Sequence, residues 1–167
     1  MWINQDKNKD NIRLDIGAGD PATLELQEKD YVLNDIEPNK GIDLVCDILD
    51  LKKDLKEEQC LEIRASHILE HFNKTDLLKV IKIIHFILKD KGIFNIIVPN
   101  LKWQIQFLNN CQDETAVYYI FGGQLDKYDY HKTGFTVNIL KKLLNDNGFG
   151  ISELTEESSI KCMAFKI

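Results

Sequence analysis

Three short apolar segments of this chain each end at or near an aspartate, and this repeated pattern constrains the fold more than any other feature. Asp15 stands near the end of the first segment, Asp35 of the second and Asp47 of the third. The carboxyl ends of strands in an open α/β sheet meet at one crevice, so we expect the three carboxylates to converge there. Gly17 and Gly19 follow the first segment and permit a tight turn that a ligand can approach closely. The pattern predicts a site for a nucleoside-containing cofactor.

Strands and helices are predicted to alternate along the chain. Apolar runs predict strands at 12–16, 31–36, 42–46, 61–65 and 93–98, and two short strands at 149–154 and 160–167. An apolar stripe at helical spacing predicts a helix from Leu77 to Leu88, with Asn73 or Thr75 as N-cap and Gly92 at its end. A second helix is predicted over 137–147, ended by Gly148. This order indicates an α/β fold with a mostly parallel sheet and an antiparallel C-terminal strand.

One connection is unusually short. Only Glu37–Gly41 link the second and third predicted strands, whereas a helical crossover needs about a dozen residues or more. Either these two strands are not adjacent parallel neighbours, or a helix has been trimmed. We therefore expect a reduced sheet that lacks at least one helix on that side.

Length and composition favour an ordinary globular domain. A chain of 167 residues with 44% hydrophobic and 29% charged residues is expected to form one domain over 1–167. Its net charge of −6 argues against a nucleic-acid partner, because binding a phosphate backbone requires clustered Lys and Arg. The cysteines form no Cys-x-x-Cys pair, and no apolar run has the length of a signal peptide core or a membrane span. A cytoplasmic protein without a membrane span is the expectation.

The aspartates suit different parts of S-adenosylmethionine. Asp15 can attract the methionine ammonium, and Asp35 stands at the distance from Gly17 where an acidic side chain binds both ribose hydroxyls. Asp47 can accept a hydrogen bond from the adenine amino group while Ile48 packs on the ring. The alternative is that each aspartate only caps a turn. Their occurrence at three consecutive strand ends favours the cofactor site.

The main alternative to an S-adenosylmethionine site is a dinucleotide site, which would make the protein an NAD(P)-dependent oxidoreductase. Gly17-x-Gly19-x-x-Ala22 satisfies the relaxed fingerprint, and Asp35 lies near the expected distance. Pro21 falls inside the turn, however, and residues 20–30 show no amphipathic helix that would present its N-terminus to a pyrophosphate. Too little chain remains for a separate substrate domain.

A zinc site is the second rival. His67-Ile68-Leu69-Glu70-His71 matches the H-x-x-E-H pattern, in which a helix carries both histidines on one face beside a glutamate base. The segment directly follows a predicted strand, and no long helix offers a third ligand. We therefore predict no metal site.

Several segments together give a family resemblance. They are Leu14–Asp20, Asn34–Pro38, Cys46–Ile48, Ala65–Phe72 and Asp90–Gly92. As an ordered set they resemble class I S-adenosylmethionine-dependent methyltransferases. Phe121–Gln124 and Tyr130–Phe135 are similar to a small bacterial and phage subgroup associated with polysaccharide biosynthesis. The resemblance runs from Ile12 to Phe149 and implies a reduced Rossmann-like methyltransferase fold with S-adenosyl-L-methionine as cofactor.

The resemblance also implies roles for individual residues. Ser66 and His67 match the turn after the fourth strand, which lines the methyl-transfer pocket of the family. The predicted cofactor-binding set is Asp15, Gly17, Gly19, Asp35, Ile36, Asp47, Ile48, Ser66 and His67. Pro21 replaces a usual third glycine, and the helix after Asp35 is missing. These departures affect the turn that binds the cofactor tail.

The substrate side is predicted from the region 121–135, which is rich in glycine, aromatic and polar residues and lacks periodicity. Such a segment is typical of a substrate loop, or else of an ordered structural loop. His131, Asp129 and His67 are the candidates for a general base, with Tyr128 and Tyr130 as pocket walls.

The acceptor is expected to be a small molecule or a sugar-linked group methylated on oxygen, and this expectation rests largely on the family association. Amino-methylating enzymes typically carry Asn/Asp-Pro-Pro-aromatic after the fourth strand, where this chain has Ser66–Leu69. A non-catalytic module that assists another enzyme is a further alternative; it would bind cofactor weakly or not at all.

Overall fold

The structure is a computed structural model that describes residues 1–19, 30–111 and 113–167. The predictions made for Pro21, for Ala22 and for most of residues 20–30 lie outside these ranges. Within them, no helix has the length and hydrophobicity needed to cross a membrane.

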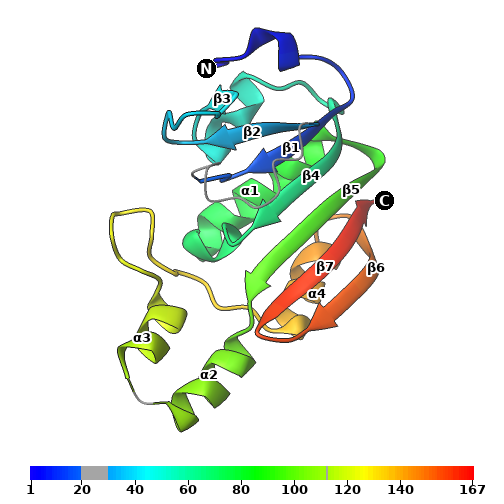
Figure 1. The fold of residues 1–167 in the computed structure, drawn as a ribbon. Coiled ribbons are helices and arrows are strands. Elements are labelled where there is room, and N and C mark those ends of the chain that lie inside the picture. Colours follow the sequence, from blue (N-terminus) through cyan, green and yellow to red (C-terminus); the bar gives the residue numbers. More distant parts are fainter. Residues whose placement is uncertain (20–29, 112) are drawn as a thin grey trace.

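Seven strands of the described chain form one mixed sheet in the order β3-β2-β1-β4-β5-β7-β6 (Figure 1). The strands are β1 (Ile12–Ile16), β2 (Tyr31–Asp35), β3 (Leu44–Val45), β4 (Cys60–Ser66), β5 (Leu88–Pro99), β6 (Phe149–Glu156) and β7 (Ser159–Lys166). The first five are mutually parallel, β7 runs antiparallel to β5, and β6 runs antiparallel to β7. The predicted α/β fold with a mostly parallel sheet and antiparallel C-terminal pairing is confirmed.

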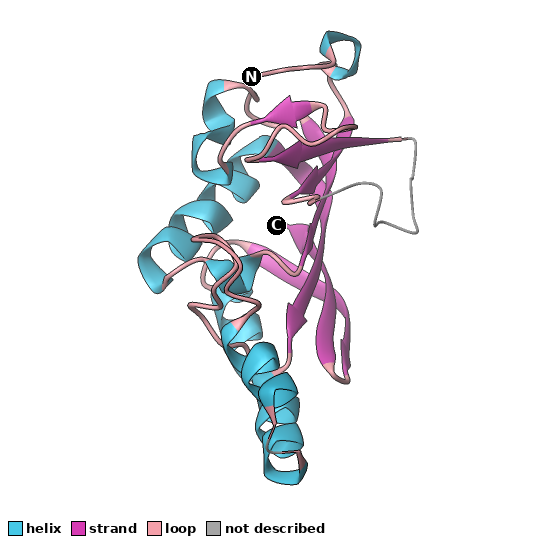
Figure 2. Cartoon of the chain, turned by 60° about the vertical axis from the view of Figure 1, so that its left-hand side comes forward, coloured by secondary structure: helices cyan, strands magenta, loops and turns pink. Residues whose placement is uncertain are grey.

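Helices cover one face of this sheet (Figure 2). They are α1 (Lys74–Ile87), α2 (Leu101–Asn110), α3 (Glu114–Phe121) and α4 (Val137–Asn145), with short 3-10 helices η1 (Gln5–Lys7), η3 (Ile48–Lys53) and η4 (Leu69–His71). The apolar stripe of α1 and the inner side of α4 pack with the sheet into one hydrophobic core. Helices α2 and α3 extend away from the sheet beyond the end of β5 (Figure 1).

Helix α1 begins as expected but ends earlier than Gly92. The side chain of Asn73 accepts hydrogen bonds from the backbone N–H groups of Thr75 and Asp76, so Asn73 is the N-cap. The helix stops at Ile87 because Leu88 is already extended and pairs with β4. Gly92 lies within β5, where the register to β4 shifts and a Cβ atom would stand 2.7 Å from a backbone oxygen. The glycine therefore permits a strand irregularity rather than a helix end.

The short link between β2 and β3 reflects a trimmed connection. The two strands are adjacent and parallel, yet the described residues 36–43 between them contain turns and no helix. β3 has only two residues instead of the predicted five, and the buried amide of Asn34 donates to the carbonyl oxygens of Leu44 and Cys46. A side chain thus supplies some of the hydrogen bonds that a longer strand would make.

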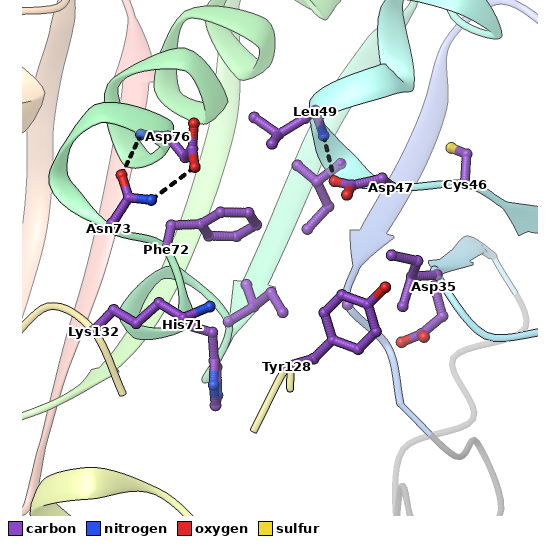
Figure 3. A pocket seen from close by; sticks show the side chains of 14 residues that line it. Asp35, Cys46, Asp47, Leu49, His71, Phe72, Asn73, Asp76, Tyr128 and Lys132 are labelled. Atoms are coloured by element: carbon purple, nitrogen blue, oxygen red, sulfur yellow. Dashed lines mark hydrogen bonds between the residues drawn. The ribbon is translucent and has the colours of Figure 1, made fainter. Parts of the chain in front are cut away.

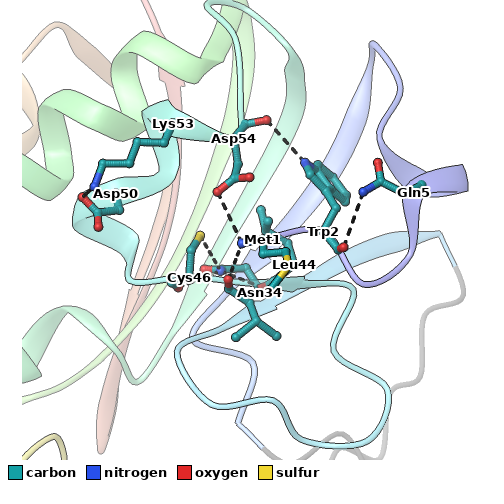
Figure 4. Close-up of polar contacts among 10 residues, drawn as sticks. Met1, Trp2, Gln5, Asn34, Leu44, Cys46, Asp50, Lys53 and Asp54 are labelled. Carbon is teal, nitrogen blue, oxygen red and sulfur yellow. Dashed lines mark hydrogen bonds and ion pairs between the residues drawn. The ribbon is translucent and has the colours of Figure 1, made fainter.

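The N-terminal segment covers the outer edge of β3 (Figure 4). Trp2 forms an antiparallel bridge with Leu44, and the N–H of Ile3 donates to the carbonyl of Asp43 at 2.8 Å. The indole of Trp2 is buried and donates to the carbonyl of Asp54. An edge strand that would otherwise present free backbone groups is therefore paired.

Candidate functional site

A cavity of about 280 Å³ lies where β1 and β2 end and η3 and α1 begin, and we call it the first cavity (Figure 3). It is lined by Gly17, Asp35, Ile36, Cys46, Asp47, Ile48, Leu49, Ile68, His71, Phe72, Asn73, Asp76, Tyr128 and Lys132. Its position at the carboxyl ends of parallel strands is where open α/β sheets bind ligands.

Asp35 is held firmly at the end of β2. One carboxylate oxygen accepts a hydrogen bond from the N–H of Gly19 at 2.8 Å, and the other accepts from the N–H of Glu37 at 2.9 Å. These bonds tie the glycine turn after β1 to β2 and fix the orientation of the carboxylate. Each oxygen has a second lone pair, so the group can still accept hydrogen bonds from two vicinal hydroxyls.

Asp47 lies across the first cavity and begins η3. Its Oδ1 accepts from the N–H of Leu49 at 2.9 Å, so the side chain both caps the 3-10 helix and borders the cavity (Figure 3). Ile48 is buried beside it. Burial raises the pKa of the neighbouring Cys46 to about 11, which keeps its thiol neutral. On this side of the cavity the carboxylate of Asp47 therefore lies next to the apolar side chain of Ile48, against which an aromatic ring could pack.

Gly17 brings the chain after β1 against the chain after β4. Its φ is +64°, and a Cβ atom built on it would lie 2.5 Å from two side-chain atoms of Ile68. The first turn can therefore approach the η4 segment only because position 17 lacks a side chain.

Asp15 does not line the first cavity. Its carboxylate is buried and pairs with the guanidinium of Arg64 at 2.6 Å. Successive side chains of a strand point to opposite faces of the sheet. Because Leu14 and Ile16 pack in the core, the side chain of Asp15 points to the other face. The expected convergence of three aspartates thus holds for Asp35 and Asp47 but not for the side chain of Asp15.

The remaining predicted cofactor residues divide between the cavity and its surroundings. Gly17, Ile36 and Ile48 line the first cavity. Gly19 reaches it only through its hydrogen bond to Asp35. Ser66, the last residue of β4, and His67, which lines the second cavity, lie outside the lining of the first.

A second cavity of about 580 Å³ adjoins the first, and His71 borders both. Its lining comes from the ends of β4 and β5, from η4, from α2 and α3, from the segment after α3, and from the turn between β6 and β7. The lining residues are His67, Glu70, His71, Pro99, Trp103, Gln104, Tyr118, Tyr119, Gly122, Gly123, Asp129, His131, Ser158 and Ser159. The three candidates for a general base, His67, Asp129 and His131, therefore share one cavity.

His131 is held in place by the backbone around it. Its N–H donates to the carbonyl of Phe121 at 3.0 Å, and the next N–H, of Lys132, donates to the carbonyl of Glu70 at 2.7 Å. The imidazole meets the ring of His71 edge to face, with 5.1 Å between centroids. Burial lowers the pKa of His131 below its usual value, and the charge of Glu70 opposes that shift.

Asp129 and His67, the other two candidates for a general base, each lie in a turn and interact mainly with residues close to them in the sequence. Asp129 Oδ2 accepts from the N–H of Leu125 at 3.2 Å, and its carbonyl accepts from Gln124, so Asp129 organises its own turn. His67 takes a left-handed φ of 52° directly after β4 and keeps an exposed side chain. The H-x-x-E-H segment is therefore a turn followed by η4, and the helix that this pattern would need does not form.

The segment 121–135 borders both cavities. Tyr128 and Lys132 line the first, and Figure 3 shows the Tyr128 ring beside Asp35. Gly122 and His131 line the second. A Cβ on Gly122 would meet the carbonyl oxygen of Asp129 at 2.4 Å, so the two arms of this segment approach closely.

Apart from Trp103, whose place after Pro99-Asn100 at the end of the fifth strand indicates the border of the pocket, sequence reasoning missed two groups of lining residues. Phe72, Asn73 and Asp76 line the first cavity from the start of α1. Hydrogen bonds from Lys79 and then Asn73 lower the pKa of Asp76. The aromatic and amide side chains of α2 and α3 line the second cavity. The signal for the first group was their place directly after the His67–His71 pattern; the second group required helices that the sequence pattern did not predict.

Comparisons of sequence find no matching family model and no matching curated protein. Comparisons of structure find many similar chains. An S-adenosylmethionine-dependent methyltransferase from Archaeoglobus fulgidus matches with a TM-score of 0.66 and 18% identity, over 96% of this chain and 88% of the other. A methyltransferase of the same kind from Methanosarcina mazei matches with a TM-score of 0.67 and 17% identity, over 95% and 93%.

A third structure was solved with ligands bound. The 1,6-didemethyltoxoflavin-N1-methyltransferase of Burkholderia thailandensis, with 1,6-didemethyltoxoflavin and S-adenosylhomocysteine, matches with a TM-score of 0.63 and 16% identity. The match covers 95% of this chain and 72% of the other. At these identities the likeness concerns the fold. The chain therefore has the Rossmann-like fold of class I S-adenosylmethionine-dependent methyltransferases.

Proposed function

We propose that this protein is an S-adenosylmethionine-dependent methyltransferase whose cofactor occupies the first cavity. The observation that carries the proposal is the placement of Asp35 and Asp47 in one cavity at the carboxyl edge of a sheet with this fold. Asp35 would accept hydrogen bonds from the ribose hydroxyls. Asp47 would accept one from the adenine amino group, while Ile36 and Ile48 pack on the ring.

The acceptor would occupy the second cavity. Methyl transfer from a sulfonium is an in-line displacement, so the acceptor must approach the methyl group from the side opposite the sulfur. The two cavities meet at His71, which supports a transfer point there. The wall beside it carries His131, Glu70 and His67, and we propose that this polar group receives the proton of an acceptor hydroxyl.

The class of acceptor is proposed from the resemblance and from the cavity. The family subgroup suggests a small molecule or a sugar-linked group, methylated on oxygen. The second cavity offers aromatic side chains of Trp103, Tyr118 and Tyr119 beside hydroxyls of Ser158 and Ser159. Aromatic faces with nearby polar groups suit a sugar ring or a similar polar ring.

Binding of S-adenosylhomocysteine tests the cofactor assignment. Calorimetry should show one site in the wild-type protein, and NADH should produce no comparable heat. Asp35→Asn removes a charge-assisted acceptor and should weaken binding roughly 10- to 100-fold. Asp50→Asn is the matched control, because Asp50 lies on η3, pairs with Lys53 and does not line the cavity. Tight NADH binding, or unchanged affinity in Asp35→Asn, would contradict the assignment.

A further inference from the structure

Glu70 is buried in an unusual way. Its side chain is 2% exposed, and neither carboxylate oxygen has a hydrogen-bond partner in the described part of the chain. His67 Nδ1 stands 3.4 Å from Glu70 Oε1, at ion-pair distance when that ring is protonated, but it makes no hydrogen bond there. A carboxylate shielded from water and left without hydrogen bonds is unfavourable unless a cation compensates its charge. Buried polar groups of this kind require a physical explanation.

Two imidazoles surround this carboxylate. His71 follows Glu70 in η4, and its Nδ1 is also buried without a partner in the described ranges. His131 approaches from a distant part of the chain, with its ring edge to face on His71. One ligand atom from each of Glu70, His71 and His131 lies within 4.8 Å of the other two.

The backbone holds these three residues together. The N–H groups of Lys132 and Thr133 both donate to the carbonyl of Glu70, at 2.7 and 3.1 Å. The hydroxyl of Thr133 donates to the carbonyl of Phe72 at 2.7 Å. The loop that carries His131 is thus fastened to both sides of the Glu70–His71 pair, so the cluster is built by the fold rather than by chance contact of mobile side chains.

We propose that Glu70, His71 and His131 bind a divalent transition-metal ion such as Zn²⁺. Two imidazoles and one carboxylate form the ligand set of many zinc sites that keep a further position open. The mixed nitrogen and oxygen donors favour such an ion over Mg²⁺ or Ca²⁺, which prefer oxygen ligands. Zinc bonds of about 2.0 to 2.1 Å hold tetrahedral ligand atoms roughly 3.4 Å apart, so modest side-chain rotations would close the set. The open position would face the second cavity, which all three residues line.

The catalytic use of this ion rests on the proposed function, whereas its binding does not. A metal ion beside an acceptor hydroxyl would lower the pKa of that hydroxyl, and its proton would pass to His67, the member of the proposed proton-accepting group that does not bind the ion. The acceptor oxygen then forms a bond to the methyl carbon as the carbon–sulfur bond breaks. The sulfur keeps the electron pair, which yields S-adenosylhomocysteine and the methyl ether.

Metal binding is measured on the full chain after removal of metals. Calorimetry with Zn²⁺ alone should show one tight site per chain. Titration with Co²⁺ should give the strong visible absorption of a four- or five-coordinate ion, without the sulfur-to-cobalt charge-transfer band that cysteine ligands produce. Glu70→Gln and His131→Ala should each weaken Zn²⁺ binding by at least about 10-fold, the loss expected even for groups that only support ligands.

His85→Ala is the matched control, since it removes an imidazole from α1 outside the cavity and should leave the affinity unchanged. Thermal melting of the metal-free variants checks folding, and Glu70→Gln keeps the side-chain shape if His131→Ala is unstable. Absence of a single tight site, a cobalt spectrum with thiolate ligation, or full affinity in the Glu70 variant would each overturn the proposal. Zn²⁺ binding without S-adenosylhomocysteine binding would reject the proposed function and leave the metal site standing.

Discussion

Gly17 shows at the scale of one residue how the first cavity depends on backbone geometry. The residue needs a left-handed φ, and it also leaves room for Ile68. Gly19 has a nearly identical φ of +66°, but a Cβ there would meet no described atom within 4 Å. Replacing Gly19 by a residue with a side chain should therefore cost only backbone strain, whereas replacing Gly17 should cost both backbone strain and a clash with Ile68.

Alanine at each position should reveal this difference. Gly19→Ala carries only the left-handed penalty, about 1 to 2 kcal/mol. Gly17→Ala adds the overlap with Ile68 and should lower the free energy of unfolding by about 1 to 3 kcal/mol more. Urea denaturation measures both, and Ile68→Ala in the Gly17→Ala background should remove the excess. Equal destabilisation by the two alanines would show that Ile68 does not limit the turn.

Single residues of the site were predictable where the strand end alone decides their position. Asp35 is the last residue of β2 and Asp47 comes shortly after β3, and a carboxylate at such a point faces the crevice. Asp15 lies within β1, one residue before its end, where alternation between the two faces decides the direction. The partner that holds it, Arg64, lies on β4 and could be identified only with the register of the sheet.

His85 joins the last turn of α1 to the antiparallel edge of the sheet. Its ring meets Phe149 of β6 edge to face, with 5.4 Å between centroids. Burial lowers its pKa first, the charge of Lys166 lowers it further, and Asp90 opposes both. The folded protein therefore favours the neutral ring more than the unfolded chain does.

The sign of the pH effect follows from this lowered pKa. Below the usual histidine value of about 6.5 the unfolded chain binds a proton that folded His85 binds only at lower pH. The contribution of His85 to the free energy of unfolding is thus fully present above the usual histidine pKa, and it is lost as the pH falls from there toward the lowered pKa of folded His85. His85→Gln should show a smaller loss in urea denaturation between about pH 7.5 and 5.5. An equal loss in both proteins would contradict the assignment to His85.

Elements that contact the core were predictable from their apolar pattern, and elements that do not were missed. α1 carries a buried stripe, and the strands are short apolar runs. Gln104 is the only buried residue of α2, and Ala116 is the only buried residue of α3. These two helices pack mainly against each other rather than against the sheet. Their contact is an aromatic cluster of Trp103, Phe107 and Tyr119. A pattern search for a core-facing stripe cannot detect helices stabilised in this way.

The whole molecule places two cavities at one edge of a single sheet. The first is lined by the turns after β1, β2 and β3 and by the start of α1, and Tyr128 and Lys132 also border it (Figure 3). The second is lined by the ends of β4 and β5, by η4, by α2 and α3, by the segment after α3 and by the turn between β6 and β7. This division supports one cavity for a nucleoside and another for an acceptor. It also explains why the sequence motifs point to the cofactor side, whereas the acceptor side is assembled from distant segments.

A crystal structure with S-adenosylhomocysteine bound tests the central claim most directly. The account predicts adenosine in the first cavity, with the ribose hydroxyls on Asp35, the adenine ring against Ile48 near Asp47, and the sulfur directed toward His71. A ligand that binds elsewhere on the protein, or a ribose that makes no contact with Asp35, would contradict the account.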